Sequence, residues 1–568
     1  DEILSTLAFN SSILKELHGC LKCVRYDAAT MLQYHDGLYA PVIALFCYLY
    51  SHVLTIIGED EFYSPETAVQ SSEKRSYELF ALSETKEIAH VLNRLLYKLH
   101  SGQVSLNRKN VDNRFMRVVE RLMSELISRD SRRQFTEPGF WIIPEASQNL
   151  AQLTAGNKVL GKFSGLIERI PHVYPFEDRI RVFNAQVEDE KVAIGYDEYV
   201  FDDMDPIDIR REFIVEDAIA KMSHMRTDLK NHIQIRFLDS YGNAEDGIDG
   251  GGLFKEFISL FLTEVFHPNF GLFTETAENT LIPNPYPIHP NSTQLYELVG
   301  TLLGKALFEG VLIEPKFARA FLNQILRKKN QINDLQSIDS ELYRNLLKLK
   351  ETPKVEELGF TFSTSENRYG VIEDIPLRPG GEQIGVTDDN KYDYIHAMAD
   401  FKLNTQMKSQ SRSFRRGMSY VIPYDWLRIF NQDELQVMIS GASDIFDVED
   451  LRAHTLYSGG YNNDDPTVRI FWNTVTQMSN DEKKKFLEFI TGCSRPPALG
   501  FGSLNPKFTI QRIQPMEGYY DFKELNDRLP TSSTCANLLR LPEYSTKEQL
   551  IEKLLYAIIS NVGFHLTQ

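Results

Sequence analysis

Residues 529–539 read LPTSSTCANLL, and within this stretch Cys535 follows four consecutive hydroxyl-bearing residues, 531–534. Pro530 and the small polar residues predict a loop, and the leucines after Asn537 predict entry into a buried strand. Hydroxyl groups and loop amides can donate hydrogen bonds to a thiolate, which is the nucleophilic form of cysteine. The other interpretation is an inert, buried cysteine, since most free cysteines are core residues. The local pattern leaves both interpretations open.

Composition places the chain among ordinary globular proteins. Of its 568 residues, 42% are hydrophobic and 25% are charged, which excludes a disordered or fibrous chain. At roughly 150 residues per domain, this length predicts three or four domains. The 61 Lys and Arg against 79 Asp and Glu give a net charge of -18, which argues against binding nucleic acid through bulk charge. Five cysteines without a dense cluster predict a reducing, intracellular setting and no disulfide framework.

One uncharged segment, residues 38–58, is long enough to cross a bilayer. Pro41, Tyr48 and His52 dilute its apolar character, and no Lys/Arg cluster flanks it. We therefore expect a buried core helix here and no membrane partner. The chain begins with Asp1 rather than methionine, so we expect a fragment or processed product whose upstream targeting signal is not visible.

The first 170 or so residues predict an all-helical region. Apolar residues recur at helical spacing in residues 88–99 and 115–126, and each set forms one stripe that must pack against a partner. Residues 171–206 contain prolines and end in an acidic run, which predicts a connector. Beyond it, helical stretches alternate with strand-like ones such as residues 233–238, which predicts an α+β region.

Three short motifs suggest ligand sites but lack required residues. Residues 20–23 read CLKC without a second pair or histidine cluster to complete a zinc site. Residues 300–306 resemble a phosphate loop, but one intervening residue is missing and Ala306 replaces the required Ser or Thr. Residues 245–256 resemble a calcium loop, but Gly247 cannot supply a side-chain ligand. We therefore predict no metal and no cofactor.

Seven blocks in addition to the cysteine stretch resemble HECT-type ubiquitin ligases, in the order found in that family. They are residues 247–257 (GIDGGGLFKEF), 304–310 (GKALFEG), 414–417 (FRRG), 457–461 (YSGGY), 471–472 (FW), 489–497 (FITGCSRPP) and 541–544 (LPEY). The resemblance covers about residues 207–568. Within the family, the first and sixth blocks most resemble the proteasome-associated, chain-extending branch.

The resemblance implies a bilobal HECT-like catalytic domain of the α+β class behind an all-helical extension. The implied parts are the extension at 1–170, the connector at 171–206, a mostly helical N-lobe at 207–440 with a conjugating-enzyme-binding subdomain at about 313–395, an interlobe hinge at 441–444, and a smaller α/β C-lobe at 445–568. Small residues at the hinge tolerate the backbone changes that would swing the C-lobe.

The resemblance also implies a reaction. Cys535 would accept ubiquitin from a ubiquitin-conjugating enzyme as a thioester and pass it to lysines of substrates or of ubiquitin, building chains for proteasomal degradation. Thioester exchange suits cysteine because a thiolate both attacks and leaves readily. The implied partners are the conjugating enzyme, ubiquitin and protein substrates, with the proteasome as a further candidate. The implied location is the cytoplasm, the nucleus or both.

Further residues match family positions one by one. Four apolar residues match the groove for the conjugating enzyme, with a small local core as the alternative interpretation of each: Leu342, Leu346, Leu358 and Phe360. The remaining matches are the hinge residues Gly441, Ala442 and Ser443, the tail residue Phe564, and the catalytic-loop supports Ser533, Thr534 and Asn537. The sequence departs from the family pattern at four places. Ser533 stands where a His is common, Ala536 where a larger apolar residue is usual, and Thr352 where an aromatic residue is common. Four residues follow Phe564, where the family usually has three.

Two rival functions stay open at this point. A catalytically inactive helical and HECT-like scaffold would keep partner binding and form no thioester. A cysteine hydrolase would need a histidine positioned to activate Cys535, for which His454 and His565 are the candidates.

Overall fold

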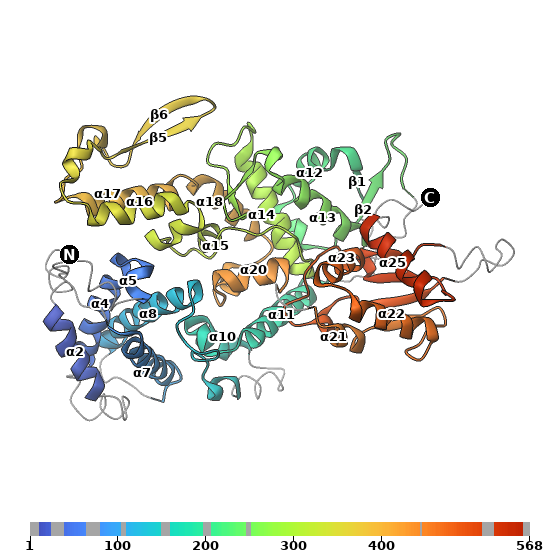
Figure 1. The fold of residues 1–568 in the computed structure, drawn as a ribbon, viewed down its shortest axis with the longest axis horizontal. Coiled ribbons are helices and arrows are strands. Elements are labelled where there is room, and N and C mark those ends of the chain that lie inside the picture. The colour runs from blue at the N-terminus through green and yellow to red at the C-terminus, as the bar shows by residue number, and fades with distance from the viewer. Residues whose placement is uncertain are drawn as a thin grey trace. The chain divides into compact units, whose positions relative to one another are not determined.

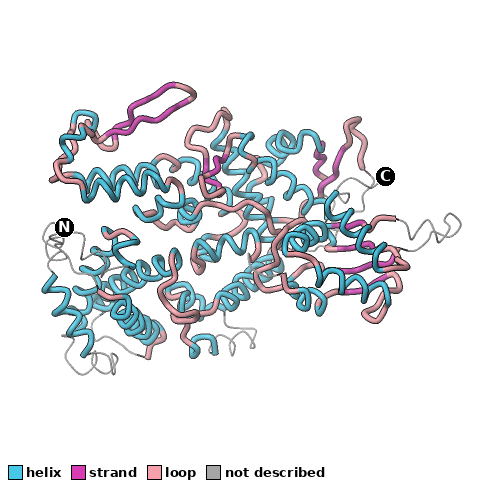
Figure 2. The backbone as a smooth tube through the Cα atoms, viewed as in Figure 1, coloured by secondary structure: helices cyan, strands magenta, loops and turns pink. Residues whose placement is uncertain are grey.

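A computed structural model of the chain describes residues 11–23, 39–63, 80–103, 109–148, 160–196, 206–245, 252–442, 446–513 and 528–560. The chain divides into two compact units (Figures 1 and 2). The first unit comprises residues 1–181, 343–352 and 428–430, and the second comprises residues 182–342, 353–427 and 431–568. Among the described residues, every strand belongs to the second unit, which confirms an α+β fold with a helical N-terminal extension.

The first unit is helical throughout its described residues. Its elements are α2 (Ser11–Cys23), α4 (Tyr39–Ile56), α5 (Glu59–Tyr63), α7 (Leu82–His100), α8 (Lys109–Arg132), α10 (Leu160–Arg169) and the single turn η2 (Pro171–Val173). Helix α4 packs against α2 and α8, and α7 packs against α8. The apolar stripes predicted at 88–99 and 115–126 lie on α7 and α8, where they form part of the buried core.

Helix α4 is the buried core helix expected at residues 38–58. Phe46, Tyr50 and Leu54 are fully buried, and the Tyr50 hydroxyl lies 3.2 Å from the Thr85 hydroxyl. Among the described helices, none combines the length and apolarity needed to span a membrane. Two further polar side chains of α4 bond within the helix: the Ser51 hydroxyl donates to the Tyr48 carbonyl oxygen at 2.9 Å and the Thr55 hydroxyl to the His52 carbonyl oxygen at 2.7 Å.

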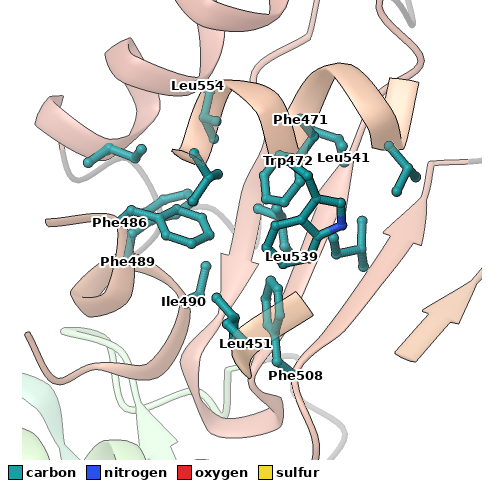
Figure 3. Packing of buried hydrophobic residues seen from close by; sticks show 14 of the residues in the cluster. Leu451, Phe471, Trp472, Phe486, Phe489, Ile490, Phe508, Leu539, Leu541 and Leu554 are labelled. Carbon is teal, nitrogen blue, oxygen red and sulfur yellow. The ribbon is translucent and has the colours of Figure 1, made fainter. Parts of the chain in front are cut away.

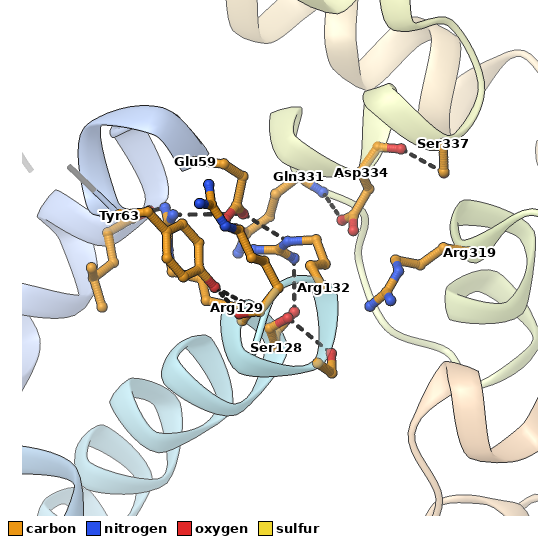
Figure 4. A network of polar contacts seen from close by, with 12 residues as sticks. Glu59, Tyr63, Ser128, Arg129, Arg132, Arg319, Gln331, Asp334 and Ser337 are labelled. Carbon is orange, nitrogen blue, oxygen red and sulfur yellow. Dashed lines mark hydrogen bonds and ion pairs between the residues drawn. The ribbon is translucent and has the colours of Figure 1, made fainter. Parts of the chain in front are cut away.

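A buried arginine closes the carboxyl end of α4 (Figure 4). Arg129 on α8 donates hydrogen bonds to the Leu54 and Ile57 carbonyl oxygens, the latter at 2.9 Å. These are backbone acceptors that a helix end leaves without intrahelical partners. Arg132, one turn later, pairs with the Glu59 carboxylate at 2.7 Å. The two arginines tie α8 to α4 and to the start of α5.

The predicted connector at 171–206 contains an 18-residue helix, α11 (Phe176–Ala193). Val182, Phe183 and Val187 on this helix are buried. The flanking prolines and acidic residues are typical of a linker. The apolar residues between them are nevertheless spaced for one helical face, which accounts for the helix.

The elements that the structure describes in the second unit up to residue 442 are mostly helices, and the strands among them form three two-stranded sheets. They are β1 (Ile207–Arg210), η3 (Arg211–Phe213), α12 (Ile214–Met222), η4 (Arg226–Lys230), β2 (Ile235–Leu238), α13 (Gly252–Phe266), η5 (Pro268–Phe270), β3 (Phe273–Glu275), β4 (Leu281–Pro283), α14 (Ser292–Glu309), α15 (Arg319–Ile325), η6 (Ile332–Ser337), α16 (Ser340–Glu351, with residues 343 onward in the first unit), η7 (Val355–Leu358), β5 (Ser363–Arg368), β6 (Val371–Pro376), η8 (Gly381–Gln383), α17 (Lys391–Asp400), η9 (Phe401–Thr405), α18 (Lys408–Met418), α19 (Tyr424–Leu427) and α20 (Gln432–Ser440). Strands β1 and β2 are parallel, whereas β3–β4 and β5–β6 are antiparallel. In η6, the Asp334 carboxylate accepts the Gln331 amide, a cap shown in Figure 4.

Helices α14 and α18 cross at glycines. A Cβ atom added at Gly300 would lie 2.0 Å from the Phe414 carbonyl oxygen, and one at Gly417 would lie 1.8 Å from the Glu297 oxygen. The phosphate-loop-like stretch 300–306 is therefore part of a helix whose glycine permits close backbone contact. Its Lys305 is fully buried and pairs with Glu309 at 2.5 Å.

Residues 446–560 form a smaller α/β region of the second unit. Its elements are α21 (Val448–Ala453), β7 (Leu456–Ser458), α22 (Pro466–Gln477), α23 (Asn480–Thr491), η10 (Phe501–Ser503), β8 (Thr509–Arg512), β9 (Thr531–Ser533), η11 (Thr534–Ala536), β10 (Leu538–Leu541) and α25 (Lys547–Ser560). The sheet order is β7-β8-β10-β9, with β9 antiparallel to β10 and the other pairs parallel. Helices α22, α23 and α25 share one hydrophobic core with this sheet, in which Trp472 packs beside Phe471, Leu539 and Leu541 (Figure 3).

Candidate active site

Cys535 lies on the single turn η11, which joins β9 to β10. Ser533 is the register partner of Leu538, so the chain reverses within the four residues between them. Buried Leu539 and Leu541 anchor β10 in the hydrophobic core. The structure describes the backbone of Cys535, whereas its side chain lies outside the described part. The cysteine is thus carried by a short turn whose two flanking strands belong to the sheet.

Asn537 fixes the shape of this turn. It is fully buried and adopts a left-handed backbone conformation, with φ 45° and ψ 45°. Asparagine tolerates this conformation better than most residues. Its side-chain amide donates to the Pro506 carbonyl oxygen at 2.7 Å, and its own carbonyl oxygen accepts the Thr509 amide at 2.9 Å. The turn is therefore tied to the segment that leads into β8.

A lysine from the larger part of the second unit contacts the same turn. The ammonium nitrogen of Lys255 on α13 lies 3.1 Å from the Thr534 carbonyl oxygen and 3.2 Å from the Asn537 Oδ1 atom. Thr534 also packs beside Gly492, at the end of α23. The predicted supports Thr534 and Asn537 therefore lie together around the backbone of Cys535. Ser533 ends β9 and is half-buried.

The predicted hinge residues Gly441 and Ala442 follow α20, whereas Ser443 lies outside the described residues. Gly441 has φ 80° and ψ 170°, a conformation that side chains disfavour, and a Cβ atom there would lie 2.6 Å from the Pro496 carbonyl oxygen. The Ala442 amide donates to that same oxygen at 2.8 Å. Glycine is required here because two backbone segments approach closely.

Charged side chains reinforce this approach. Glu314 accepts hydrogen bonds from the Ser494 amide and from the Ser494 hydroxyl, the latter at 3.1 Å. The Arg495 guanidinium donates to the Ser440 hydroxyl at 2.6 Å and to the Glu314 backbone oxygen at 3.3 Å. We call the set Glu314, Ser440, Gly441, Ala442, Ser494, Arg495 and Pro496 the hinge contact.

Two other cysteines whose side chains the structure describes, Cys47 and Cys493, are buried free thiols. Burial raises the pKa of Cys47 far above its usual range, and burial together with the Glu314 charge raises the pKa of Cys493 to about 12. A thiol with such a pKa carries almost no thiolate at neutral pH. Both are therefore poor nucleophiles.

The hydrolase interpretation required a histidine near Cys535. The His454 ring at the end of α21 interacts with Asp450 of its own helix, with Nδ1 at 2.9 Å from the Asp450 carbonyl oxygen and 3.1 Å from its carboxylate. His565 lies outside the described residues. In the described part of the chain, no group of three or more His, Cys, Asp or Glu side chains is arranged to hold a metal.

The four predicted groove residues differ in exposure. On α16, Leu346 is buried and Leu342 is half-buried. Leu358 and Phe360 expose 49% and 43% of their surface. The Phe360 ring stacks on Tyr394 of α17, with ring centroids 6.2 Å apart and an interplanar angle of 6°. The assignment of these residues to one groove stays a prediction.

Sequence reasoning missed Lys255 and Glu314. Lys255 lies 279 positions before Thr534 along the chain, and Glu314 lies 180 positions before Ser494. A charged residue near a helix end or in a loop ordinarily indicates a solvent-facing side chain, so no local pattern pointed to either contact. The predicted tail residue Phe564 lies outside the described residues.

Comparison with known proteins defines the class of this fold and site. Residues 259–567, more than half of the chain, match the family described as HECT-domain (ubiquitin-transferase). The chain therefore belongs to the HECT-domain family, as the cysteine stretch and the seven blocks predicted.

Relatives with curated names extend the similarity into the helical region. The chain is 37% identical over 540 residues to the E3 ubiquitin-protein ligase UPL6 of Arabidopsis thaliana, an alignment that covers 92% of this chain and 51% of that protein. It is 33% identical over 608 residues to the human ubiquitin-protein ligase E3B, covering 100% of this chain and 55% of that protein. It is 35% identical over 427 residues to the E3 ubiquitin-protein ligase HUL5 of Saccharomyces cerevisiae, covering 71% and 45%. The chain thus spans about half the length of the curated relatives that it matches.

Proposed function

We propose that this chain is the catalytic part of a ubiquitin-protein ligase that carries ubiquitin as a thioester on Cys535. The observation that supports this most directly is the position of Cys535 on a turn held by Asn537, within the region matched by the HECT-domain family. The buried thiols Cys47 and Cys493 have raised pKa values, which leaves them unsuited to the same role.

The first step is a thioester exchange. The Cys535 thiolate attacks the carbonyl carbon of the thioester that joins ubiquitin to the conjugating enzyme. The tetrahedral intermediate collapses, a carbon–sulfur bond to Cys535 forms, and the cysteine thiolate of the conjugating enzyme leaves. One thioester is broken and one is made, so the step is close to neutral in free energy.

The second step forms an amide. A lysine amine of the acceptor, a substrate or a ubiquitin already attached, loses a proton to a general base and attacks the thioester carbonyl. The Cys535 thiolate leaves and is ready for another cycle. Because an amide is more stable than a thioester, this step is downhill. Repetition on ubiquitin lysines builds a polyubiquitin chain.

Other predicted residues take supporting roles in this proposal. The exposed pair Leu358 and Phe360, with Leu342 and Leu346, receives an apolar loop of the conjugating enzyme. Gly441, Ala442 and Ser443 form the joint between lobes, and Phe564 helps to set the lobes and the acceptor lysine. Ser533, Thr534 and Asn537 hold the turn of Cys535.

The proposal extends to the destination of the products. The resemblance of residues 247–257 and 489–497 to the proteasome-associated, chain-extending branch of the family supports chains that mark proteins for the proteasome, with the proteasome itself as a partner. The reducing environment implied by buried free thiols suits the cytoplasm, the nucleus or both.

A single-turnover assay with charged conjugating enzyme tests the proposal. The full chain should form a ubiquitin adduct that a reductant removes, and Cys535→Ala should abolish it. Cys47→Ala is the matched control and should retain the adduct, because Cys47 is a buried core thiol. An adduct that persists in Cys535→Ala would place the nucleophile elsewhere, and no adduct from several conjugating enzymes would favour a scaffold.

A further inference from the structure

Lys255 contacts the turn of Cys535 from a different part of the second unit. It lies in the first turn of α13, a helix that packs against η11, and its side chain is half-buried. Its ammonium group reaches one acceptor on each side of Cys535: the Thr534 carbonyl oxygen at 3.1 Å and the Asn537 Oδ1 atom at 3.2 Å. Hydrogen bonds from a charged donor are stronger than those between neutral groups. We call these two hydrogen bonds the loop contact.

The geometry brings the ammonium charge close to the cysteine backbone. A planar peptide keeps a carbonyl oxygen about 2.8 Å from the next Cα atom, so the Lys255 nitrogen lies within about 6 Å of the Cys535 Cα atom. The charge is therefore held next to the residue that bears the thioester. It cannot be moved without breaking contacts to the turn itself.

Asn537 makes the loop contact dependent on the shape of the turn. Its amide nitrogen is committed to the Pro506 oxygen, so its Oδ1 atom is available to Lys255. If the turn moves away from α13, both acceptors move with it and the two hydrogen bonds break. The loop contact therefore exists in one arrangement of these parts and favours that arrangement.

In this arrangement the turn of Cys535 packs on α13, which is not an element of the predicted groove. Phe360 stacks on Tyr394 of α17, and Figure 1 shows α17 and the β5–β6 hairpin at the end of the second unit away from α13 and α23. A conjugating enzyme bound beside Phe360 would meet the cysteine only after the turn leaves α13. The docked turn is thus suited to the step that follows loading.

We propose that Lys255 is a positioning residue for the second step of transfer, in which it docks the turn of Cys535 on α13 while the thioester meets the acceptor amine. This inference rests on the proposed function and assigns a role to a residue outside the groove, the hinge and the cysteine stretch. It predicts that loss of the ammonium group slows discharge of the thioester and spares its formation.

The test separates the two steps in the full chain. Loading is measured with charged conjugating enzyme, and discharge is measured by chasing the preformed thioester with free lysine. Lys255→Met should slow discharge about tenfold and change loading by less than about twofold, since a hydrogen-bonded charge contributes on this scale. Lys255→Arg should recover most of the discharge rate, because a guanidinium can donate to both acceptors. Lys221→Met, which removes a lysine that donates to the Asp208 carbonyl oxygen, should match wild type in both steps.

Other results would overturn either the role of Lys255 or the proposed function, and the assay tells these two cases apart. Discharge at the wild-type rate in Lys255→Met would overturn the inference and leave the proposed function intact. Equal slowing of both steps without recovery in Lys255→Arg would also overturn it, because Lys255 would then be a general structural residue. A wild-type chain that forms no adduct would overturn the proposed function itself. Loading in Lys255→Met serves as the check that this variant is folded.

Discussion

The hinge contact and the loop contact join the same two parts of the second unit, residues 252–442 and 446–560, in different ways. The hinge contact combines backbone hydrogen bonds, a carboxylate and a guanidinium around Gly441, whose conformation excludes a side chain. The loop contact consists of two hydrogen bonds from one flexible lysine. The first resembles a fixed joint, and the second is suited to release.

The difference follows from what each contact must do in the proposed reaction. A joint that keeps the lobes together throughout the cycle benefits from several short contacts that share one backbone approach. A contact that must break and re-form each cycle should cost little to open, and the loop contact has only two hydrogen bonds to break, fewer than the hinge contact. Variants at the two places should therefore differ in kind: hinge variants should lose stability, and loop variants should lose rate.

The largest effect is expected for Gly441→Ala. Alanine would be strained at φ 80° and ψ 170°, and its Cβ atom would lie 2.6 Å from the Pro496 oxygen. Strain of this kind costs on the order of 1–3 kcal/mol before the displacement of residues 494–497 is added. In a unit of this size we expect a fall in Tm of about 2–4 °C, measured by thermal unfolding.

Gly380→Ala is the matched control for this prediction. Gly380 also has a positive φ, 69°, but a Cβ atom there would meet nothing within 4 Å. It should lower Tm by clearly less than Gly441→Ala. Because Gly380 has ψ 17° and Gly441 has ψ 170°, equal losses would show that neither this backbone difference nor the approach of Pro496 adds to the cost, and would remove one side of the comparison.

An effect of comparable size is expected at Asn537. Asn537→Gly keeps access to the left-handed conformation but removes the amide that binds Pro506 and Lys255, whereas Asn537→Ala removes the amide and adds backbone strain. Loss of a buried hydrogen bond costs about 1–3 kcal/mol, and left-handed strain adds roughly 1–2 kcal/mol. Thermal unfolding should rank wild type above Asn537→Gly and Asn537→Gly above Asn537→Ala.

Discharge to free lysine should fall in both Asn537 variants, since each removes one acceptor of Lys255. An Asn537→Gly protein with wild-type stability and wild-type discharge would mean that the amide supports neither the turn nor the loop contact. If Asn537→Gly has wild-type stability but slower discharge than wild type, the amide is needed for the loop contact and not for the stability of the turn.

Single helices and strands could be predicted from the sequence, because their signals are local. The strand expected at 233–238 matches β2, and the helical stripe at 88–99 matches α7, because local periodicity determines such elements. In the sequence, Ser545-x-x-Glu548 is a capping-box pattern that predicts the start of a closing helix, but in α25 it is the Thr546 hydroxyl that accepts a backbone hydrogen bond, from the Gln549 amide at 3.2 Å. Ser and Thr are both favoured N-cap residues, so the sequence alone does not show which of two adjacent ones caps the helix. The backbone geometry determines which one does.

The residues of the candidate site also differ in whether the sequence predicts them. Cys535, Thr534 and Asn537 were predicted because they are adjacent in the sequence and belong to one recognisable stretch. Lys255 and Glu314 were not, because each reaches its partner across 180 or more positions. Such pairings arise from the packing of whole elements, which a local pattern does not encode.

The smallest effect is expected for Glu488→Gln on α23, beside the hinge contact. Burial, and next the charge of Glu314, raise the pKa of the half-buried Glu488 carboxyl above its ordinary value of 4.5. The folded state therefore binds this proton more tightly than the unfolded state, and stability falls as pH rises through the interval between the two pKa values. Glutamine removes the charge, so Glu488→Gln should raise Tm slightly at pH 8, with a gain that shrinks as pH is lowered to 5.

Glu482→Gln on the same helix gives the opposite sign and tests the reasoning. Hydrogen bonds from the Ser479 amide and hydroxyl lower the pKa of Glu482, which closes a capping box at the start of α23. Its charged form stabilises the folded state above the unfolded pKa, and this contribution is lost as pH falls through the folded value. Glu482→Gln should therefore lower Tm at pH 8. If Glu488→Gln also lowers Tm at pH 8, burial and the Glu314 charge do not destabilise the charged form of Glu488, and the carboxylate then stabilises α23 beside the hinge contact.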